Sequence, residues 1–336
     1  MDKNAKISLP AKVARILNTL GEHGYEAYAV GGCVRDSLLG RMPQDWDITT
    51  SARPEQVKAL FRHTIDTGIQ HGTVTVMLDH EGFEVTTYRI DGEYEDARHP
   101  KEVAFTANLL EDLKRRDFTI NAMAYNEVTG LVDAFDGIGD LERGVIRCVG
   151  NAMERFSEDA LRMLRAVRFA AQLGFSIERE TQEAIAGLAG NIKKVSAERI
   201  QVELVKLLTS PNPGELKVAY RTGLTAVFLP EFDMMMETPQ NNQHHCYSVG
   251  EHTLKAIEAV PADKVLRLTM LLHDIAKPAC KTTDKKGVDH FYGHPVRGSE
   301  MARGILRRLK FDNDTTDRVC RLVHWHDDNP ELSGKA

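Results

Sequence analysis

The hydrophobic pattern of this chain changes its period near residue 150, and this change limits the folds that are open to it. Before that point, short runs rich in β-branched and aromatic residues alternate with glycine-bearing turns, which predicts strands at 28–30, 45–49, 73–78 and 83–90. After it, apolar residues recur at helical spacing in segments that end at Gly or Pro. We therefore expect an α+β protein, in which a mixed α/β domain precedes an all-helical region.

The expected helices share apolar positions that recur every three or four residues. In the first part of the chain, a helix leads in over 9–24, and shorter helices are expected at 34–39 and 54–61. In the second part we expect helices at 155–173, 180–189, 196–209, 214–222, 251–260, 264–276, 295–309 and 313–326.

The length of the chain predicts more than one domain, because domains usually hold roughly 100 to 200 residues and this chain has 336. The polar stretch 238–243 is a strong loop signal, and histidines become frequent just after it. We expect a mixed domain at 1–150, a helical neck and body at 151–238, and a second helical domain at 239–336. Residues 331–336 show no helical pattern, so this last helical bundle is expected to be incomplete.

Composition narrows the class of protein further. The 43 basic and 49 acidic residues give a net charge of −6, so any nucleic-acid surface must be a local basic patch on an acidic whole. The five cysteines form no C-x-x-C pair, which indicates reduced thiols. No segment has the roughly 18 to 20 apolar residues of a membrane span, or the pattern of a signal peptide. We expect a cytoplasmic protein without a membrane partner.

A glycine pair and two aspartates lie close together in the first domain. Gly31 and Gly32 follow a predicted strand and precede a helix, so their N–H groups could face an anion such as a triphosphate, with Arg35 one turn further on. In Asp45-Trp46-Asp47 the period of a strand would place both carboxylates on one face.

Two carboxylates side by side require cations if their face is even partly buried. A pair of divalent ions bridged by Asp45 and Asp47 would suit phosphoryl transfer, and Glu84 on a later strand is the candidate third carboxylate. Either motif alone is common on exposed strands and in turns. Their order within one segment favours an active site over a structural turn.

This order, G-G, then R-D, then D-x-D, resembles the head domain of the class II nucleotidyltransferases, the family of bacterial CCA-adding enzymes and bacterial poly(A) polymerases. The resemblance implies a polymerase-β-like α/β head, an all-α neck and body, and the addition of C and A from CTP and ATP to the 3′ end of tRNA without a template. It also implies two Mg²⁺ ions at Asp45 and Asp47, with Glu84 nearby. The tRNA 3′-hydroxyl would attack the α-phosphate, and pyrophosphate would leave.

Further motifs extend the resemblance through the first 210 residues. Residues 115–122 (RRDFTINA) resemble the motif in which the arginine nearer the aspartate, Arg116 here, contacts the nucleotide phosphates and sugar. Residues 136–141 resemble the hinge-like motif between head and neck, and residues 158–162 resemble the E-D-x-x-R motif that presents hydrogen-bonding groups to the incoming base. The implied nucleotide-binding residues are Gly32, Arg35, Arg116, Asp159, Arg162, Arg165 and Arg168.

The chemistry of the last four residues agrees with that role. On a single helix, Asp159, Arg162, Arg165 and Arg168 would recur every third residue and form one stripe. An aspartate accepts from an exocyclic amino group and an arginine donates to ring acceptors. Cytosine and adenine both carry such an amino group, so one protein surface could select them. The alternative is a structural Asp–Arg pair with two solvent-exposed arginines.

Two segments point to the CCA-adding branch. Residues 67–74 (TGIQHGTV) resemble that branch, whereas poly(A) polymerases of this class carry a G-[RK]-[RK]-F type signature. Residues 91–100 resemble the flexible loop of members that add the final A, although His99 stands where relatives often have arginine. A poly(A) polymerase of the same fold remains the close alternative.

The last third of the chain is rich in histidine, the commonest ligand of transition metals in proteins. Of the 13 histidines, eight follow residue 243. The pair His273-Asp274, with His252 one helix earlier, resembles the signature of HD phosphohydrolases. His294 and His324 would complete the ligand set of a divalent transition metal, with Asp327 or Asp328 as a last carboxylate.

Two alternatives remain for this region. In one, the histidines cap helices and pack against RNA without a metal. In the other, from a different class of function, the protein is an HD phosphohydrolase whose head only binds nucleotide.

Overall fold

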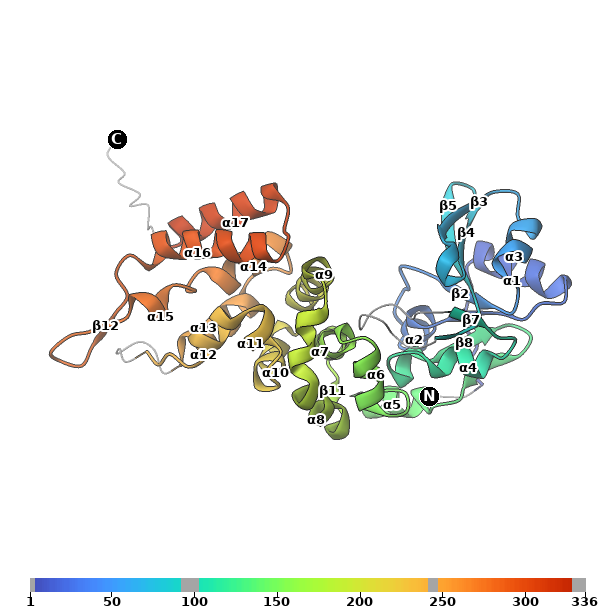
Figure 1. The fold of residues 1–336 in the computed structure, drawn as a ribbon, viewed down its shortest axis with the longest axis horizontal. Helices are drawn as coiled ribbons and strands as arrows, with labels where there is room; N and C mark the ends of the chain where they lie inside the picture. Colours follow the sequence, from blue (N-terminus) through green and yellow to red (C-terminus); the bar gives the residue numbers. More distant parts are fainter. Residues whose placement is uncertain (1–3, 92–102, 241–246, 328–336) are drawn as a thin grey trace. The chain divides into compact units, whose positions relative to one another are not determined.

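The computed structural model describes residues 4–91, 103–240 and 247–327 (Figure 1). Most of the loop expected at 91–100, with His99, lies outside the described residues, as do His244, His245 and Asp328. The chain divides into two compact units. The first comprises Met1–Asp159 and Ser176–Thr181, and the second comprises Ala160–Phe175 and Gln182–Ala336. The expected α+β architecture is confirmed, and the expected three-domain division stays a prediction.

The first unit is built on a sheet of seven strands in the order β3-β4-β5-β2-β1-β8-β9 (Figure 1). Strands β2 and β5 run parallel, and every other neighbouring pair is antiparallel. The strands are β1 (Ala27–Val30), β2 (Asp47–Thr50), β3 (Thr64–Gly68), β4 (Thr73–Leu78), β5 (Glu81–Thr87), β8 (Met123–Asn126) and β9 (Gly130–Asp133). Because β2 begins at Asp47, the expectation that Asp45 lies in this strand was wrong, and Asp45 belongs to the segment that precedes it.

One face of the sheet carries the core. Ile16 and Leu20 of α1 (Ala11–Glu22) and Val57 of α3 (Pro54–Leu60) pack with Val74 of β4 and Val85 of β5. Along β4 and β5, the alternation of side chains then leaves polar residues on the other face. There Thr75 pairs across the strands with Glu84. This polar face is the one from which a site can open.

Short elements complete the first unit. The antiparallel strands β6 (Arg89–Asp91) and β7 (Val103–Phe105) precede α4 (Leu109–Lys114), whose Leu113 packs on Tyr28 and Val30 of β1. The others are α2 (Gly32–Leu38), η1 (Ile69–His71), η2 (Thr119–Asn121), α5 (Gly137–Arg143), β10 (Val145–Ile146), α6 (Ala152–Glu158) and β11 (Ser176–Ile177).

The second unit is helical. Its helices include α7 (Leu161–Leu173), α9 (Ala197–Leu208), α10 (Leu216–Arg221), α11 (Thr225–Phe228), α12 (Pro230–Met236), α13 (Val249–Ala259), α14 (Lys264–Leu272), α15 (Lys277–Cys280), α16 (His294–Arg308) and α17 (Asn313–Trp325). Helix α8 (Arg179–Leu188) crosses the division between the units, and a short hairpin of β12 (Thr282–Thr283) and β13 (Asp289–His290) precedes α16. Among the described residues, no helix is long and apolar enough to cross a membrane.

The prediction of a single helix over 155–173 was wrong. Helix α6 ends at Glu158 and α7 begins at Leu161, because Asp159 adopts an extended backbone with φ −140° and ψ 105°. Asp159 therefore does not share a helical stripe with the arginines of α7.

Candidate active site

Three carboxylates gather at the edge of the polar face. The parallel register aligns Ile48 of β2 with Val85 of β5, so the preceding residues, Asp47 and Glu84, lie side by side. The pKa of Glu84 is raised by burial and then by the charges of Asp47 and Asp45, which shows that all three are close. The structure thus brings together the three predicted catalytic residues, although Asp45 reaches the site from outside the strand.

The electrostatics of Asp47 suit a cation site. Burial raises its pKa, the positive charge of Arg116 opposes that rise, and the charge of Asp45 adds to it. A group of carboxylates that repel one another is stabilised by divalent cations, and carboxylate oxygens are the donors that Mg²⁺ prefers. The donor set therefore fits the magnesium ions implied by the motif resemblance.

The glycine pair makes room for two arginines. A Cβ on Gly31 would lie 3.4 Å from Nη1 of Arg116, and a Cβ on Gly32 would lie 3.4 Å from Nη2 of Arg35. Gly31 also has a φ of +83°, a conformation that glycine adopts most readily. Its N–H donates to the carbonyl of Met123 at 3.2 Å, so this amide does not face an anion as expected. The positive charge at the site comes from the two guanidinium groups.

Each arginine is held by residues that the initial set of candidates did not include. Nη1 of Arg35 donates to Oδ1 of Asn121 at 2.6 Å, and Nδ2 of Asn121 donates to Oδ1 of Asp117 at 3.2 Å. Nη2 of Arg116 lies 3.4 Å from Oδ2 of Asp112. Asp117 and Asn121 belong to the RRDFTINA motif, which was the available signal, whereas no motif marked Asp112.

The arginines of α7 lie in two environments. Arg168 is buried and forms a double contact with Glu203 of α9, with Nε at 2.7 Å from Oε2 and Nη2 at 3.3 Å from Oε1. Arg162 and Arg165 are only partly buried, and Nη1 of Arg165 lies 3.8 Å from Oε1 of Glu203. Arg168 thus helps to pack α7 against α9, a geometry that does not support its expected contact with nucleotide.

A second cluster of polar side chains lies in the helical unit. His252 of α13, His273 and Asp274 after α14, His294 at the start of α16 and His326 after α17 form two groups of three that share Asp274. Oδ1 of Asp274 lies 3.3 Å from Nε2 of His294 and 3.7 Å from Nε2 of His326. Oδ2 lies 3.3 Å from Nε2 of His273 and 3.6 Å from Nε2 of His252.

His324, which was expected in this cluster, lies outside it, and His326 takes its place. The ring of His324 packs on Trp325 with ring centroids 4.7 Å apart. Successive residues of a helix are rotated by about 100°, so residues two apart point to nearly opposite sides. Of the two expected carboxylates, Asp327 is described, and its Oδ2 lies 3.4 Å from Nε2 of His294.

The histidines are oriented as metal ligands are. Nδ1 of His273, His294 and His326 lies 2.6, 2.9 and 2.6 Å from the backbone carbonyls of Met270, Phe291 and Val323, respectively. A carbonyl only accepts, so each Nδ1 carries a proton, and in the neutral ring Nε2 offers its lone pair to the centre of the cluster.

The shared carboxylate also fits a metal ligand. Although burial alone would raise the pKa of Asp274, the adjacent imidazoles of His273, His294 and His326, which stabilise the carboxylate when they are protonated, hold it well below its usual value of 3.8. Its Oδ2 is buried, and no donor meets it with hydrogen-bond geometry among the residues that the structure describes, although Nζ of Lys277 lies 2.9 Å away. This imidazole and carboxylate set suits a divalent transition metal.

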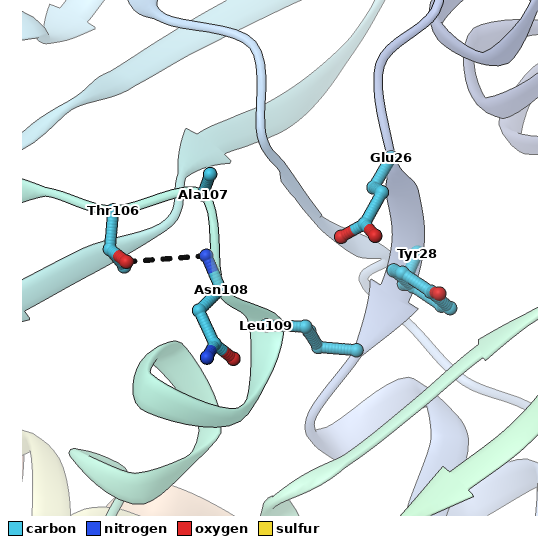
Figure 2. A pocket seen from close by; sticks show the side chains of 6 residues that line it. All are labelled: Glu26, Tyr28, Thr106, Ala107, Asn108 and Leu109. Carbon is cyan, nitrogen blue, oxygen red and sulfur yellow. Dashed lines mark hydrogen bonds between the residues drawn. The ribbon is translucent and has the colours of Figure 1, made fainter.

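A pocket in the first unit lies away from the carboxylates. Figure 2 shows Glu26 and Tyr28 on one side and the segment from Thr106 to Leu109 on the other, around a volume of about 420 Å³. Glu26 precedes β1 and Gly31 follows it, so the pocket lies at the other end of this strand from the glycine pair. None of the predicted site residues lines it.

Known protein families match along most of the chain. The model of the poly A polymerase head domain matches residues 27–147. A model described as a probable RNA and SrmB-binding site of polymerase A matches 174–236, and the HD domain model matches 243–334. Together with the carboxylates and arginines of the first unit, these matches define a nucleotidyltransferase head followed by an HD domain.

The names of individual relatives are more specific than those of the family models. The CCA-adding enzyme of Leuconostoc mesenteroides is 53% identical over 207 residues, which are 61% of this chain and 52% of that protein. The CCA-adding enzyme of Lactiplantibacillus plantarum is 54% identical over 209 residues, 62% of this chain and 50% of that protein. The solved structure of the Bacillus stearothermophilus CCA-adding enzyme in complex with CTP has a TM-score of 0.76 and 35% identity, covering 94% of this chain and 70% of that chain.

The chain belongs to the family of CCA-adding enzymes, which confirms the resemblance drawn from the motifs. It spans about half the length of the curated relatives it matches, 52% of the Leuconostoc enzyme and 50% of the Lactiplantibacillus enzyme.

Proposed function

We propose that this protein adds C and A, from CTP and ATP, to the 3′ end of tRNA without a nucleic-acid template. The observation that carries the proposal is the gathering of Asp45, Asp47 and Glu84 near Arg116, whose guanidinium lies beside Gly31. The relatives support the choice of substrates. One similar structure, with 28% identity and a TM-score of 0.55, is a tRNA nucleotidyltransferase complexed with a primer tRNA and an incoming ATP analog.

The proposed roles follow from the chemistry of each group. Arg35 and Arg116 bind the triphosphate through charge-assisted hydrogen bonds. Asp45 and Asp47, with Glu84 beside them, would hold two Mg²⁺ ions, which when bound would lower the pKa of the attacking 3′-hydroxyl of tRNA and stabilise charge on the phosphate oxygens. The hydroxyl attacks the α-phosphate, a new phosphodiester bond forms, and pyrophosphate leaves with the electrons of the broken bond.

The choice of base is assigned to Asp159 and Arg162. The carboxylate of Asp159 accepts from the exocyclic amino group of cytosine or adenine, and the guanidinium of Arg162 donates to a ring acceptor. Uracil has no amino group, and guanine has none at the corresponding position, so this pair would disfavour both.

The proposal is tested with tRNAs that lack one, two or three nucleotides of the CCA end, each offered one labelled triphosphate at a time in Mg²⁺. We expect the tRNA lacking three nucleotides to accept CTP first, and the tRNA lacking only the final A to accept only ATP, once. Long runs of A on every primer would instead identify a poly(A) polymerase. No incorporation on any primer would reject nucleotidyl transfer.

A second activity is proposed for the HD domain, because four imidazole Nε2 atoms surround the buried carboxylate of Asp274 there. We infer that His252, His273, Asp274, His294 and His326 hold a divalent transition metal and that this site hydrolyses phosphoesters. The test is elemental analysis of the purified protein, followed by hydrolysis of a chromogenic phosphodiester with Mn²⁺, Co²⁺ or Ni²⁺ added. Absence of bound metal after reconstitution would reject the site.

A further inference from the structure

Asp112 of α4 is a buried acid that no motif marked. Its side chain is completely inaccessible to solvent, yet it lies on a helix of only six residues near the surface of the head. A buried carboxylate is tolerated only when it is paired and hydrogen-bonded. Its partners therefore show what the carboxylate organises.

Donors from two other segments, and from the residues that follow Asp112 within one helical turn, meet this carboxylate. Oγ1 of Thr49 donates to Oδ2 at 3.0 Å, and the backbone N–H of Arg89 donates to Oδ1 at 3.3 Å. Arg115 approaches Oδ1 through both Nε and Nη2 at 3.3 Å, and Nη2 of Arg116 approaches Oδ2 at 3.4 Å. Both oxygens are thus occupied, by two neutral donors and two cations.

The charge balance indicates that the acid is ionised. Burial by itself would raise the pKa of Asp112, but the charges of Arg115 and Arg116, with the hydrogen bonds from Arg89 and Thr49, bring it below its usual value. An ionised carboxylate between two guanidinium groups fixes their direction more strongly than a neutral acceptor would.

Two of these partners lead directly to the site of nucleotidyl transfer. Nη1 of Arg116 lies beside Gly31, while Nη2 of the same guanidinium is held by Asp112. Thr49 is two residues after Asp47 in β2, so the same carboxylate is tied to the strand that begins with a catalytic aspartate. Asp112 therefore links the arginine to the strand without lying beside the glycine pair itself.

We propose that Asp112 is a positioning residue that holds the guanidinium of Arg116 against the glycine pair for binding of the nucleotide triphosphate. In this role Asp112 would contact neither the nucleotide nor a metal ion, and it would act through Arg116. This inference rests on the proposed function, since it assigns a partner to a residue of that same site.

The test is a double-mutant cycle with Asp112→Asn, Arg116→Gln and the double variant. Binding of CTP and of cytidine is measured by calorimetry in Mg²⁺ without tRNA, so that no transfer occurs. A hydrogen bond to a charged group contributes about tenfold or more to binding. We therefore expect Asp112→Asn to weaken CTP binding on the order of tenfold and to leave cytidine binding unchanged, because cytidine carries no phosphate.

The double variant separates positioning from folding. If Asp112 acts through Arg116, adding Asp112→Asn to Arg116→Gln should cost no further CTP affinity, which is a non-additive result. Asp112→Asn alone leaves the guanidinium of Arg116 without its counter-charge, whereas the double variant removes that guanidinium as well. The double variant therefore remains informative if Asp112→Asn alone fails to fold. Thr49→Val is the matched control, because it removes a neutral donor to the same carboxylate and should keep CTP binding within about twofold of the wild type.

Several outcomes would overturn the inference. Equal losses for CTP and cytidine, additive losses in the cycle, or a loss in Thr49→Val as large as in Asp112→Asn would show that Asp112 only supports the fold. Wild-type protein that binds CTP but transfers no nucleotide to any tRNA would reject the proposed function. The binding cycle would then still decide the role of Asp112.

Discussion

Nε2 of His326 lies 3.2 Å from Nε2 of His294, although the two residues are 32 positions apart in the chain. Both Nδ1 atoms face backbone carbonyls, so in the neutral rings two lone pairs would oppose each other across this short distance. Such a contact requires either a proton on one Nε2 or a metal ion that both can ligate.

The first prediction compares His326 with His324 as ligands of a metal in the HD domain. His326→Ala should lower the affinity of the proposed HD-domain site for a divalent transition metal by roughly 10-fold or more, because it removes a ligand from the group that shares Asp274. His324→Ala is the matched control and should keep the metal, since its ring packs on Trp325. Elemental analysis after dialysis measures both. Equal metal content in the two variants would place the metal elsewhere.

The second prediction concerns the stability of the metal-free protein. Burial lowers the pKa of His326, but its contacts with Asp274 and with the carbonyl of Val323 outweigh burial and raise it above its usual value of 6.5. A raised pKa means that the folded state binds the proton more tightly than the unfolded state. Protonation of His326 therefore stabilises the folded state fully below pH 6.5, and this stabilisation is lost as the pH rises through the raised pKa that His326 has in the folded state.

Thermal unfolding in EDTA, which keeps the protein free of metal, measures whether stability falls or rises with pH. The Tm should fall between about pH 6 and pH 9, and His326→Ala should reduce the size of that fall. His324→Ala should show the wild-type dependence. A Tm that rises over this range would contradict the assignment.

The third prediction concerns the carboxylates of the head. Asp45→Ala and Asp47→Ala should each lower nucleotide incorporation on the order of a thousandfold, because the metal ions that we propose they hold would contribute several kcal/mol to stabilisation of the transition state. The fold and tRNA binding should persist. Asp66→Ala removes an exposed carboxylate that pairs with Lys58, and it is the control with near wild-type rates. Primer-extension rates under single-turnover conditions measure the three variants.

Sequence reasoning identified the site best where a residue's role depends on local chemistry. Glu84 on a later strand was expected to be the third carboxylate of the site, and the parallel register of β2 and β5 brings it beside Asp47. The break between α6 and α7 was not visible, because the segment from Arg155 to Leu173 is continuously compatible with a helix and only the backbone of Asp159 interrupts it.

Partners from distant segments were the harder part to predict. Glu203 lies 35 residues after Arg168, and both sit on amphipathic helices where polar residues usually face solvent. Asp112 likewise looks like an ordinary acid in the first turn of a helix. Their burial is decided by tertiary packing, which a local pattern does not contain. The misplacement of His324 has the same origin, because both His324 and His326 were available near the end of α17 and only the packing distinguishes them.

The fourth prediction tests the buried pair of the helical unit. Glu203→Gln leaves the buried guanidinium of Arg168 without its counter-charge, and breaking a buried ion pair in this way costs about 3 to 5 kcal/mol of unfolding free energy. Glu198→Gln makes the same chemical change at an exposed position of α9 and should cost less than about 1 kcal/mol. Urea unfolding measures both. Equal stabilities would show that the pair contributes little to the packing of α7 on α9.

The fifth prediction concerns the choice of base. If Asp159 and Arg162 read the edge of the incoming base, Asp159→Ala should relax discrimination against UTP and GTP more than it slows the use of CTP. A good bidentate contact is worth about 1 to 3 kcal/mol of discrimination, which is roughly 5- to 150-fold in the ratio of rates.

Arg165 provides the control for this experiment. It is partly buried on α7 near Glu203, and a contact of its guanidinium with phosphate or sugar would carry no base identity. Arg165→Ala should therefore slow all four nucleotides by a similar factor. Arg168 is a poor control, because its loss would remove the buried partner of Glu203 and destabilise the helical unit.

A structural account of Asp159 predicts a different pattern. Asp159 follows α6, and its extended backbone separates that helix from α7, so the residue could serve only to shape this junction. In that case Asp159→Ala should lower stability and activity together, with the order of preference among the four triphosphates unchanged. Values of kcat/KM for CTP, ATP, UTP and GTP on a tRNA lacking CCA, measured beside the Tm of the variant, distinguish the two accounts. A uniform drop across the four nucleotides would reject base reading by Asp159.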